Sequence, residues 1–187
     1  MANIFNAPFP QANDFEKIIK IINIPDSKKL RDYAYMRVYL NNISDRQVDY
    51  YISGCVYLAL VDKSKVFTEL GESLRKLDGV TQEAELSRIV VSDEVFGLIY
   101  FLQKFRGRQL DSDEIIEIMH KKMEFKSEAM YVRRASTIVS WLRWIDMREK
   151  NSGVVWMKED LPQEETFGGE ESIWDDMMIG DFVEEEE

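Results

Sequence analysis

The chain has 187 residues, of which 45% are hydrophobic and 32% are charged, a balance typical of a folded globular protein and not of a disordered one. Its longest apolar run, residues 95–102, is far shorter than the roughly 20 residues that a membrane helix needs. The single cysteine, Cys55, excludes an internal disulfide, and the first residues lack a basic segment followed by an apolar one, so we expect a cytoplasmic protein without a signal peptide.

Charge is distributed unevenly along the chain. Residues 159–187 contain 13 acidic residues and no Lys or Arg. The first 158 residues therefore hold all 24 Lys and Arg residues against the remaining 22 of the 35 acids, a net charge of +2, although the whole chain carries −11. An argument from net charge against nucleic-acid binding thus applies to the tail and not to the body.

The first half of the body predicts three helices, a hairpin and a short fourth helix. The expected helices cover residues 15–22, 27–40, 45–59 and 70–77. Asp14 and Ser44 are expected N-caps, and Cys55 lies on the apolar side of the third helix. Leu60-Val61 and Val66-Phe67-Thr68 flank a charged turn, which indicates a short β-hairpin.

The second half repeats this order. A long helix over residues 82–105, broken near Ser92-Asp93, precedes a helix capped by Asp111 or Ser112 and another over 127–145. After a polar stretch, Val154–Met157 predicts a returning strand. Leu58–Asp62 aligns with Leu142–Asp146 at an offset of 84 residues, which indicates that one module is repeated.

Three helices followed by a hairpin describe a winged helix, in which the third helix turns one face outward and the hairpin forms the wing. The predicted fold class is therefore mainly α with short β-hairpins. Tandem winged-helix modules would span residues 8–80 and 81–158, and an acidic tail 159–187. The alternative is an all-α bundle in which residues 61–68 form only a loop.

Two stretches of the first half carry a family resemblance. Phe9-Pro10-Gln11-Ala12-Asn13-Asp14-Phe15 leads into an Ile-rich helix, and Arg46-Gln47-Val48-Asp49-Tyr50-Tyr51 precedes Phe67-Thr68-Glu69-Leu70-Gly71. This combination resembles, over residues 8–78 and more weakly to 157, a winged-helix domain found beside type II restriction endonucleases and in related prokaryotic defence proteins. The resemblance implies a prokaryotic or phage protein concerned with DNA. It does not imply cleavage, because no nuclease domain is attached.

The expected outer faces of the two third helices, together with the wing, supply the candidate DNA contacts. Residues 120–150 hold eight Lys and Arg residues against four acids, whereas Asp49 weakens the face of the first module. Contacts to phosphate would dominate affinity and weaken with salt. The predicted DNA-binding residues are Arg46, Gln47, Tyr50, Lys63, Lys65, Lys126, Arg133, Arg134, Thr137, Arg143, Arg148 and Lys150.

We expect no enzyme, metal site or cofactor. Glu124-Phe125-Lys126 has the Glu-x-Lys spacing of metal-dependent nucleases, but the acids upstream, Asp111 and Asp113, read as a helix start. His120 is the single histidine, so a zinc cluster of His and Cys is excluded, and no phosphate-binding glycine loop occurs.

The tail alternates acids with large apolar residues over 171–183, which a purely solvating tail does not need. It either binds another protein, folds back on the basic body, or only aids solubility. The predicted partner-binding residues are Trp174, Met177, Met178, Ile179 and Phe182.

The sequence therefore favours a non-enzymatic DNA-binding protein of a prokaryotic or phage defence, restriction or regulatory system, with an acidic tail for partner binding or self-inhibition. The alternative is an acidic protein-interaction module, a subunit or inhibitor of a nuclease or polymerase assembly, that does not itself bind DNA. No membrane partner is expected, and the oligomeric state is not specified by the sequence.

Overall fold

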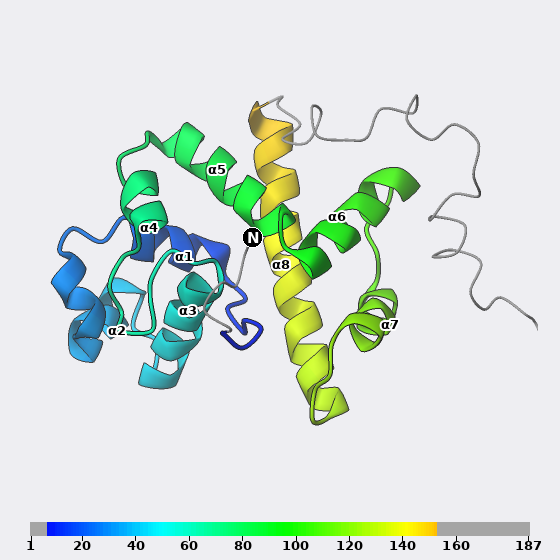
Figure 1. Cartoon of the computed structure of the whole chain (residues 1–187), viewed down its shortest axis with the longest axis horizontal. Coiled ribbons are helices and arrows are strands. Elements are labelled where there is room, and N and C mark those ends of the chain that lie inside the picture. Colours follow the sequence, from blue (N-terminus) through cyan, green and yellow to red (C-terminus); the bar gives the residue numbers. More distant parts are fainter. Residues whose placement is uncertain (1–6, 153–187) are drawn as a thin grey trace, which may run out of the picture. The chain divides into compact units, whose positions relative to one another are not determined.

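The computed structural model describes residues 7–152, which are helical and contain no β-strand (Figure 1). The elements are α1 Phe15–Ile22, the 3-10 helix η1 Ser27–Arg31, α2 Tyr33–Tyr39, α3 Asp45–Tyr57, α4 Glu69–Leu74, α5 Gly79–Val91, α6 Glu94–Arg106, α7 Ser112–Lys122 and α8 Glu128–Ser152. The mainly α part of the predicted fold class is confirmed.

Helix starts are set by side chains that accept hydrogen bonds from backbone N–H groups. Asp14 and Ser44 cap α1 and α3 as predicted, and Ser44 forms a capping box with Gln47. The predicted helix over 27–40 is instead two elements, because Asp32 accepts a hydrogen bond from Tyr35 N and begins α2. The predicted break near Ser92-Asp93 is confirmed, since Asp93 caps α6.

The predicted β-hairpin at residues 61–68 is wrong. A single antiparallel bridge joins Val61 to Phe67, and the Asp62 carboxylate holds the turn between them by accepting from the backbone of Ser64 and Val66. Directly after the bridge, Thr68 caps α4, so no residues are available to extend the bridge into a pair of strands. The second expected strand, 154–157, lies outside the described residues.

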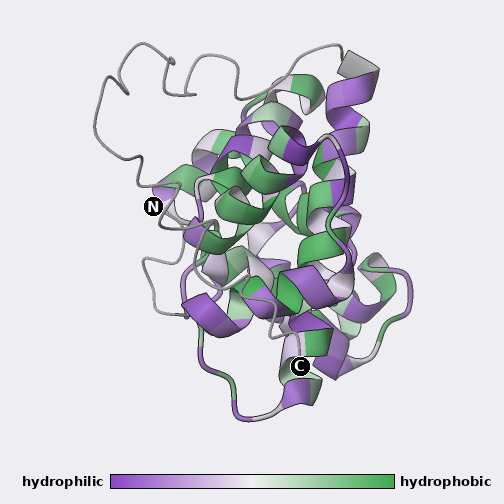
Figure 2. Ribbon diagram, turned by 90° about the vertical axis from the view of Figure 1, so that its right-hand side faces the viewer, coloured by the Kyte–Doolittle hydropathy of each residue, from purple (hydrophilic) through white to green (hydrophobic). Residues whose placement is uncertain are grey.

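Helix α8 is the longest element within residues 7–152 and continues to Ser152, beyond the predicted end at 145. It packs against α1, α6 and α7 (Figure 1). Fully buried Trp141 stacks on Phe96 at 5.0 Å between ring centroids, and its Nε1 donates to Ala12 O at 2.6 Å. The two predicted halves therefore share a core. Figure 2 shows hydrophobic residues concentrated in the middle of the helical body.

The described residues, 7–152, group together as one compact unit. The division of the body into modules 8–80 and 81–158 stays a prediction. The expected burial of Cys55 is confirmed, and burial raises the pKa of its thiol. None of the helices within residues 7–152 combines the length and apolar character that a membrane span requires. The cytoplasmic location stays a prediction.

Candidate functional site

The solvent-exposed side of α8 carries cations and no carboxylate from Ala129 to Lys150. Its exposed residues, named here the α8 face, are Ala129, Val132, Arg133, Ser136, Arg143, Met147 and Lys150. At 3.6 residues per turn they fall within an arc of about 100°. Acids on the same stretch of helix lie elsewhere: Asp146 pairs with Lys104, and Glu149 is buried. The α8 face is therefore positively charged along its length.

The three cations of the α8 face are available for a ligand. The side chains of Arg133, Arg143 and Lys150 make no hydrogen bond or ion pair within residues 7–152. A rise of 1.5 Å per residue separates Arg133 from Arg143 by about 15 Å and Arg143 from Lys150 by about 10 Å. Exposed Lys126 precedes the helix. Such spacings suit a row of charges on an extended polyanion better than one small anion.

Two of the predicted contact residues on α8 do not face outward. Thr137 is buried, and its Oγ1 donates to Asn13 Oδ1 at 2.6 Å, while Asn13 Nδ2 donates to Ser136 Oγ at 3.2 Å. Arg134 is also buried, beneath the ring of Phe125. The expected outward position of Arg134 and Thr137 is therefore wrong, because the segment before α1 and the α7–α8 linker cover that side of the helix.

A signal for the burial of Arg134 is present in the sequence. Arg134 stands four, seven and eleven residues before Ile138, Trp141 and Ile145, all of which are buried. That spacing places Arg134 inside the apolar stripe of the helix. Val132 of the same helix is apolar but 56% exposed.

Arg148 has an internal role. It lies on α8 half-buried, 3.0 Å from Glu83 of α5 and 2.6 Å from Glu16 of α1, with its guanidinium over the ring of Trp144. Its charge is compensated by these two carboxylates, which makes it a weaker candidate for phosphate contact than Arg133 or Arg143.

The candidate residues of α3 lie at its beginning. Arg46 and Gln47 are exposed, and Gln47 completes the capping box of Ser44. Arg46 Nε donates to the Tyr50 hydroxyl at 2.5 Å, and the guanidinium lies 5.5 Å from the ring centroid. No carboxylate within residues 7–152 pairs with Arg46.

The two lysines of the expected wing line a half-open pocket of about 260 Å³. The pocket is lined by Ala7, Pro8, Asp49, Ile52, Ser53, Val56, Lys63 and Lys65. Lys65 is partly neutralised there, because its Nζ lies 3.7 Å from Asp49 Oδ1 and donates to the Tyr33 hydroxyl at 2.5 Å. Lys63 is exposed.

The fold brings candidates from the two halves into one electrostatic neighbourhood. Burial lowers the pKa of Arg134, the like charge of Arg133 lowers it further, and Tyr50 of α3 opposes the shift. Gly54 of α3 lies directly against Trp141 of α8. Sequence patterns place these residues in separate modules, and only the packing of α3 near α8 reveals that they are neighbours.

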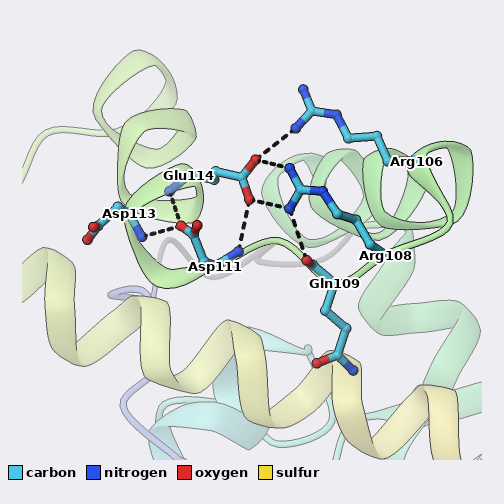
Figure 3. Close-up of polar contacts among 6 residues, drawn as sticks. All are labelled: Arg106, Arg108, Gln109, Asp111, Asp113 and Glu114. Atoms are coloured by element: carbon cyan, nitrogen blue, oxygen red, sulfur yellow. Dashed lines mark hydrogen bonds and ion pairs between the residues drawn. The ribbon is translucent and has the colours of Figure 1, made fainter.

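Asp111, one of the acids considered for a metal site, caps the beginning of α7 (Figure 3). Asp111 Oδ1 accepts from the backbone N–H groups of Asp113 and Glu114, which confirms the predicted helix start. Glu114 accepts from Arg108 at 2.6 and 2.8 Å and from Arg106 at 3.0 Å. The Arg108 guanidinium, followed by the Asp111 N–H, lowers the pKa of Glu114 to about 2. No group of three His, Cys, Asp or Glu side chains within residues 7–152 is arranged to hold a metal ion.

The predicted partner-binding residues of the tail, Trp174, Met177, Met178, Ile179 and Phe182, lie outside the described residues.

Residues 7–152 thus form an α-helical domain whose longest helix presents a cationic face. Residues 17–150 match a protein family described as Domain of unknown function (DUF7226), and the chain belongs to that family. No curated protein and no solved structure matches the chain. The resemblance to winged-helix domains of restriction systems, and the role in prokaryotic or phage defence that it implies, stay predictions.

Proposed function

We propose that the chain binds duplex DNA through the α8 face and catalyses no reaction. The observation that carries the proposal is the row of Arg133, Arg143 and Lys150 with no carboxylate among the exposed residues between Ala129 and Lys150. Cations that neutralise phosphates release counterions, and this release supplies most sequence-independent affinity. Arginine adds two parallel N–H groups that match a phosphate, and Ser136 adds a hydroxyl donor.

The acidic tail opposes this binding. Its 13 acids turn a body of net charge +2 into a chain of −11, and like charge slows the approach to DNA. Removal of residues 159–187 should therefore strengthen binding, most clearly at low salt, where electrostatic interactions reach furthest.

A second candidate function is the recognition of an acidic protein. Val132 and Met147 stand on the α8 face among the cations and are 56% and 53% exposed. Large apolar side chains beside arginine are typical of the centre of protein interfaces. This candidate predicts a complex with an acidic partner and no affinity for DNA.

The test is the binding of a labelled duplex, measured by fluorescence anisotropy against NaCl concentration, for the whole chain and for residues 1–158. Four cations, those of the α8 face and Lys126, predict a slope of log K against log salt of about −3 to −4. Arg133→Gln with Arg143→Gln should reduce its magnitude by about 2.

The matched control is Lys28→Gln with Lys76→Gln, which removes the same charge from exposed sites on η1 and after α4. We expect this pair to leave the slope unchanged. Equal losses in both pairs would assign binding to net charge and not to the α8 face. Absence of duplex binding by residues 1–158 at low salt would refute DNA binding and leave the protein-recognition candidate.

A further inference from the structure

Arg134 is a buried cation without a partner. Its residue surface is 6% exposed, and its Nε and Nη1 are buried with no hydrogen-bond acceptor within residues 7–152. No carboxylate in that part of the chain forms an ion pair with it. Arg75 also has an unpaired buried nitrogen, but its Nη2 donates to Ile24 O and Glu72 lies 3.8 Å from its Nε. Among these arginines, Arg134 is therefore the one left uncompensated.

The α7–α8 linker, Met123–Ser127, forms the cover over Arg134. The ring of Phe125 lies 4.6 Å from the guanidinium carbon, so the face of the cation is in contact with an aromatic ring. This contact does not satisfy the N–H groups at the edge of the guanidinium plane. The linker is held by Tyr131, whose hydroxyl donates to Met123 O at 2.9 Å and accepts from Phe125 N at 3.2 Å.

A charge in this position is unfavourable unless something pairs with it. Burial removes the hydration of the guanidinium, and this free-energy cost is offset in a protein interior only by an opposite charge or complete hydrogen bonding. The like charge of the neighbouring Arg133 on the same helical turn repels Arg134, which makes an anion beside Arg134 more favourable. The N–H groups of the planar guanidinium are spaced to donate to two oxygens of one oxyanion. Salt screens a buried contact between a cation and an anion less than an exposed one.

We propose that Arg134 and Arg133, with Lys126 at the rim, form a clamp for one phosphate group. The choice of a nucleic-acid backbone phosphate as the ligand rests on the proposed function, whereas the clamp itself does not. Because Nε and Nη1 have no exposed surface, entry of the phosphate displaces Phe125 and the linker that carries it. The clamp thus couples phosphate occupancy to the position of the α7–α8 linker.

The first arm of the test uses free phosphate and the full chain. Thermal unfolding is followed in sodium phosphate and in sodium chloride of equal ionic strength and pH. The Tm of the wild type should rise by about 3–5 °C at a phosphate concentration ten times Kd. Arg134→Met should lose this response and should unfold in chloride no earlier than the wild type. The control Arg88→Met, at an exposed arginine of α5 paired with Glu85, should keep the response.

An equal phosphate response in the wild type and in Arg134→Met would overturn the clamp, as would no response in the wild type. If Arg134→Met does not fold, Arg134→Lys replaces it. Lysine keeps the charge and loses the planar fork, so the Tm response should shrink. An undiminished response in Arg134→Lys would also overturn the proposal.

The second arm separates the clamp from the proposed function by measuring duplex binding of the same full-length variants. Arg134→Met should weaken duplex binding about tenfold. A phosphate response that depends on Arg134, without duplex binding by either the full chain or residues 1–158, would support the clamp for free phosphate and refute DNA binding. Duplex binding that is independent of Arg134, without a phosphate response, would refute the clamp alone.

Discussion

Replacement of Trp141 by phenylalanine probes the contact that joins the N-terminal segment to α8. Trp141 has no exposed surface, and its Nε1 donates to Ala12 O at 2.6 Å. Loss of the donor leaves a buried carbonyl unpaired, which costs about 1–3 kcal/mol. The smaller ring removes buried carbon and leaves a cavity beside Phe96 and Phe15, for about 1–2 kcal/mol more. We expect a total of about 2–5 kcal/mol.

The assay is thermal and urea unfolding followed by circular dichroism and by tryptophan fluorescence. At about 2–4 °C per kcal/mol the Tm should fall by about 4–20 °C, in one transition seen by both probes. The matched control is Trp144→Phe, since Trp144 Nε1 donates to the exposed carboxylate of Glu16, which water can solvate after the change. A cost for Trp141→Phe no larger than that of Trp144→Phe, or two separate transitions, would refute the reasoning.

Two further predictions concern α4 and α7. A Cβ on Gly71 would lie 2.1 Å from Leu60 O, so Gly71→Ala should lower the free energy of unfolding in urea by more than about 2 kcal/mol. The control is Gly79→Ala, whose Cβ would meet nothing within 4 Å and which should be neutral or stabilising by about 0.5 kcal/mol. Similar costs at both sites would contradict this reasoning. The folded-state pKa of Glu114 is lowered to about 2, so its contribution to stability is present above its ordinary pKa near 4.5 and is lost as the pH falls through 2. Melts from pH 5 to 2 should therefore show a shallower acid-side decline in Glu114→Gln than in the wild type, and parallel curves would count against the shift.

Features set by residues close together in the chain could be predicted from the sequence. Asp14, Ser44 and Asp111 bond backbone groups two or three residues away, so each helix start can be read from a short segment. The wing could not be read in this way. Residues typical of strands occur on both sides of its turn. Because Thr68 is the N-cap of α4, the backbone pairing ends after the single Val61–Phe67 bridge.

The candidate site could likewise be predicted only in part from the sequence. Arg133 and Arg134 are adjacent in sequence and similar in chemistry, yet one is exposed and the other buried. The periodicity of α8 indicates which side is apolar, but it does not show what covers that side. Asn13 and Phe125, far from these residues in sequence or in a separate linker, determine the exposure of Thr137 and Arg134. The apolar spacing of α8 places Arg134 inward, but the residues that cover it are set by tertiary packing and leave no local pattern.

The family match begins at residue 17, but the hydrophobic core begins earlier. Phe9 stacks on Phe96 at 5.3 Å, Ala12 accepts the hydrogen bond of Trp141, and Asn13 binds the hydroxyls along α8. A recombinant protein trimmed to the match would lack this segment and would present Trp141 and Phe96 to solvent, a surface prone to aggregation. The expression boundary for this protein should therefore be placed at least ten residues upstream of the match.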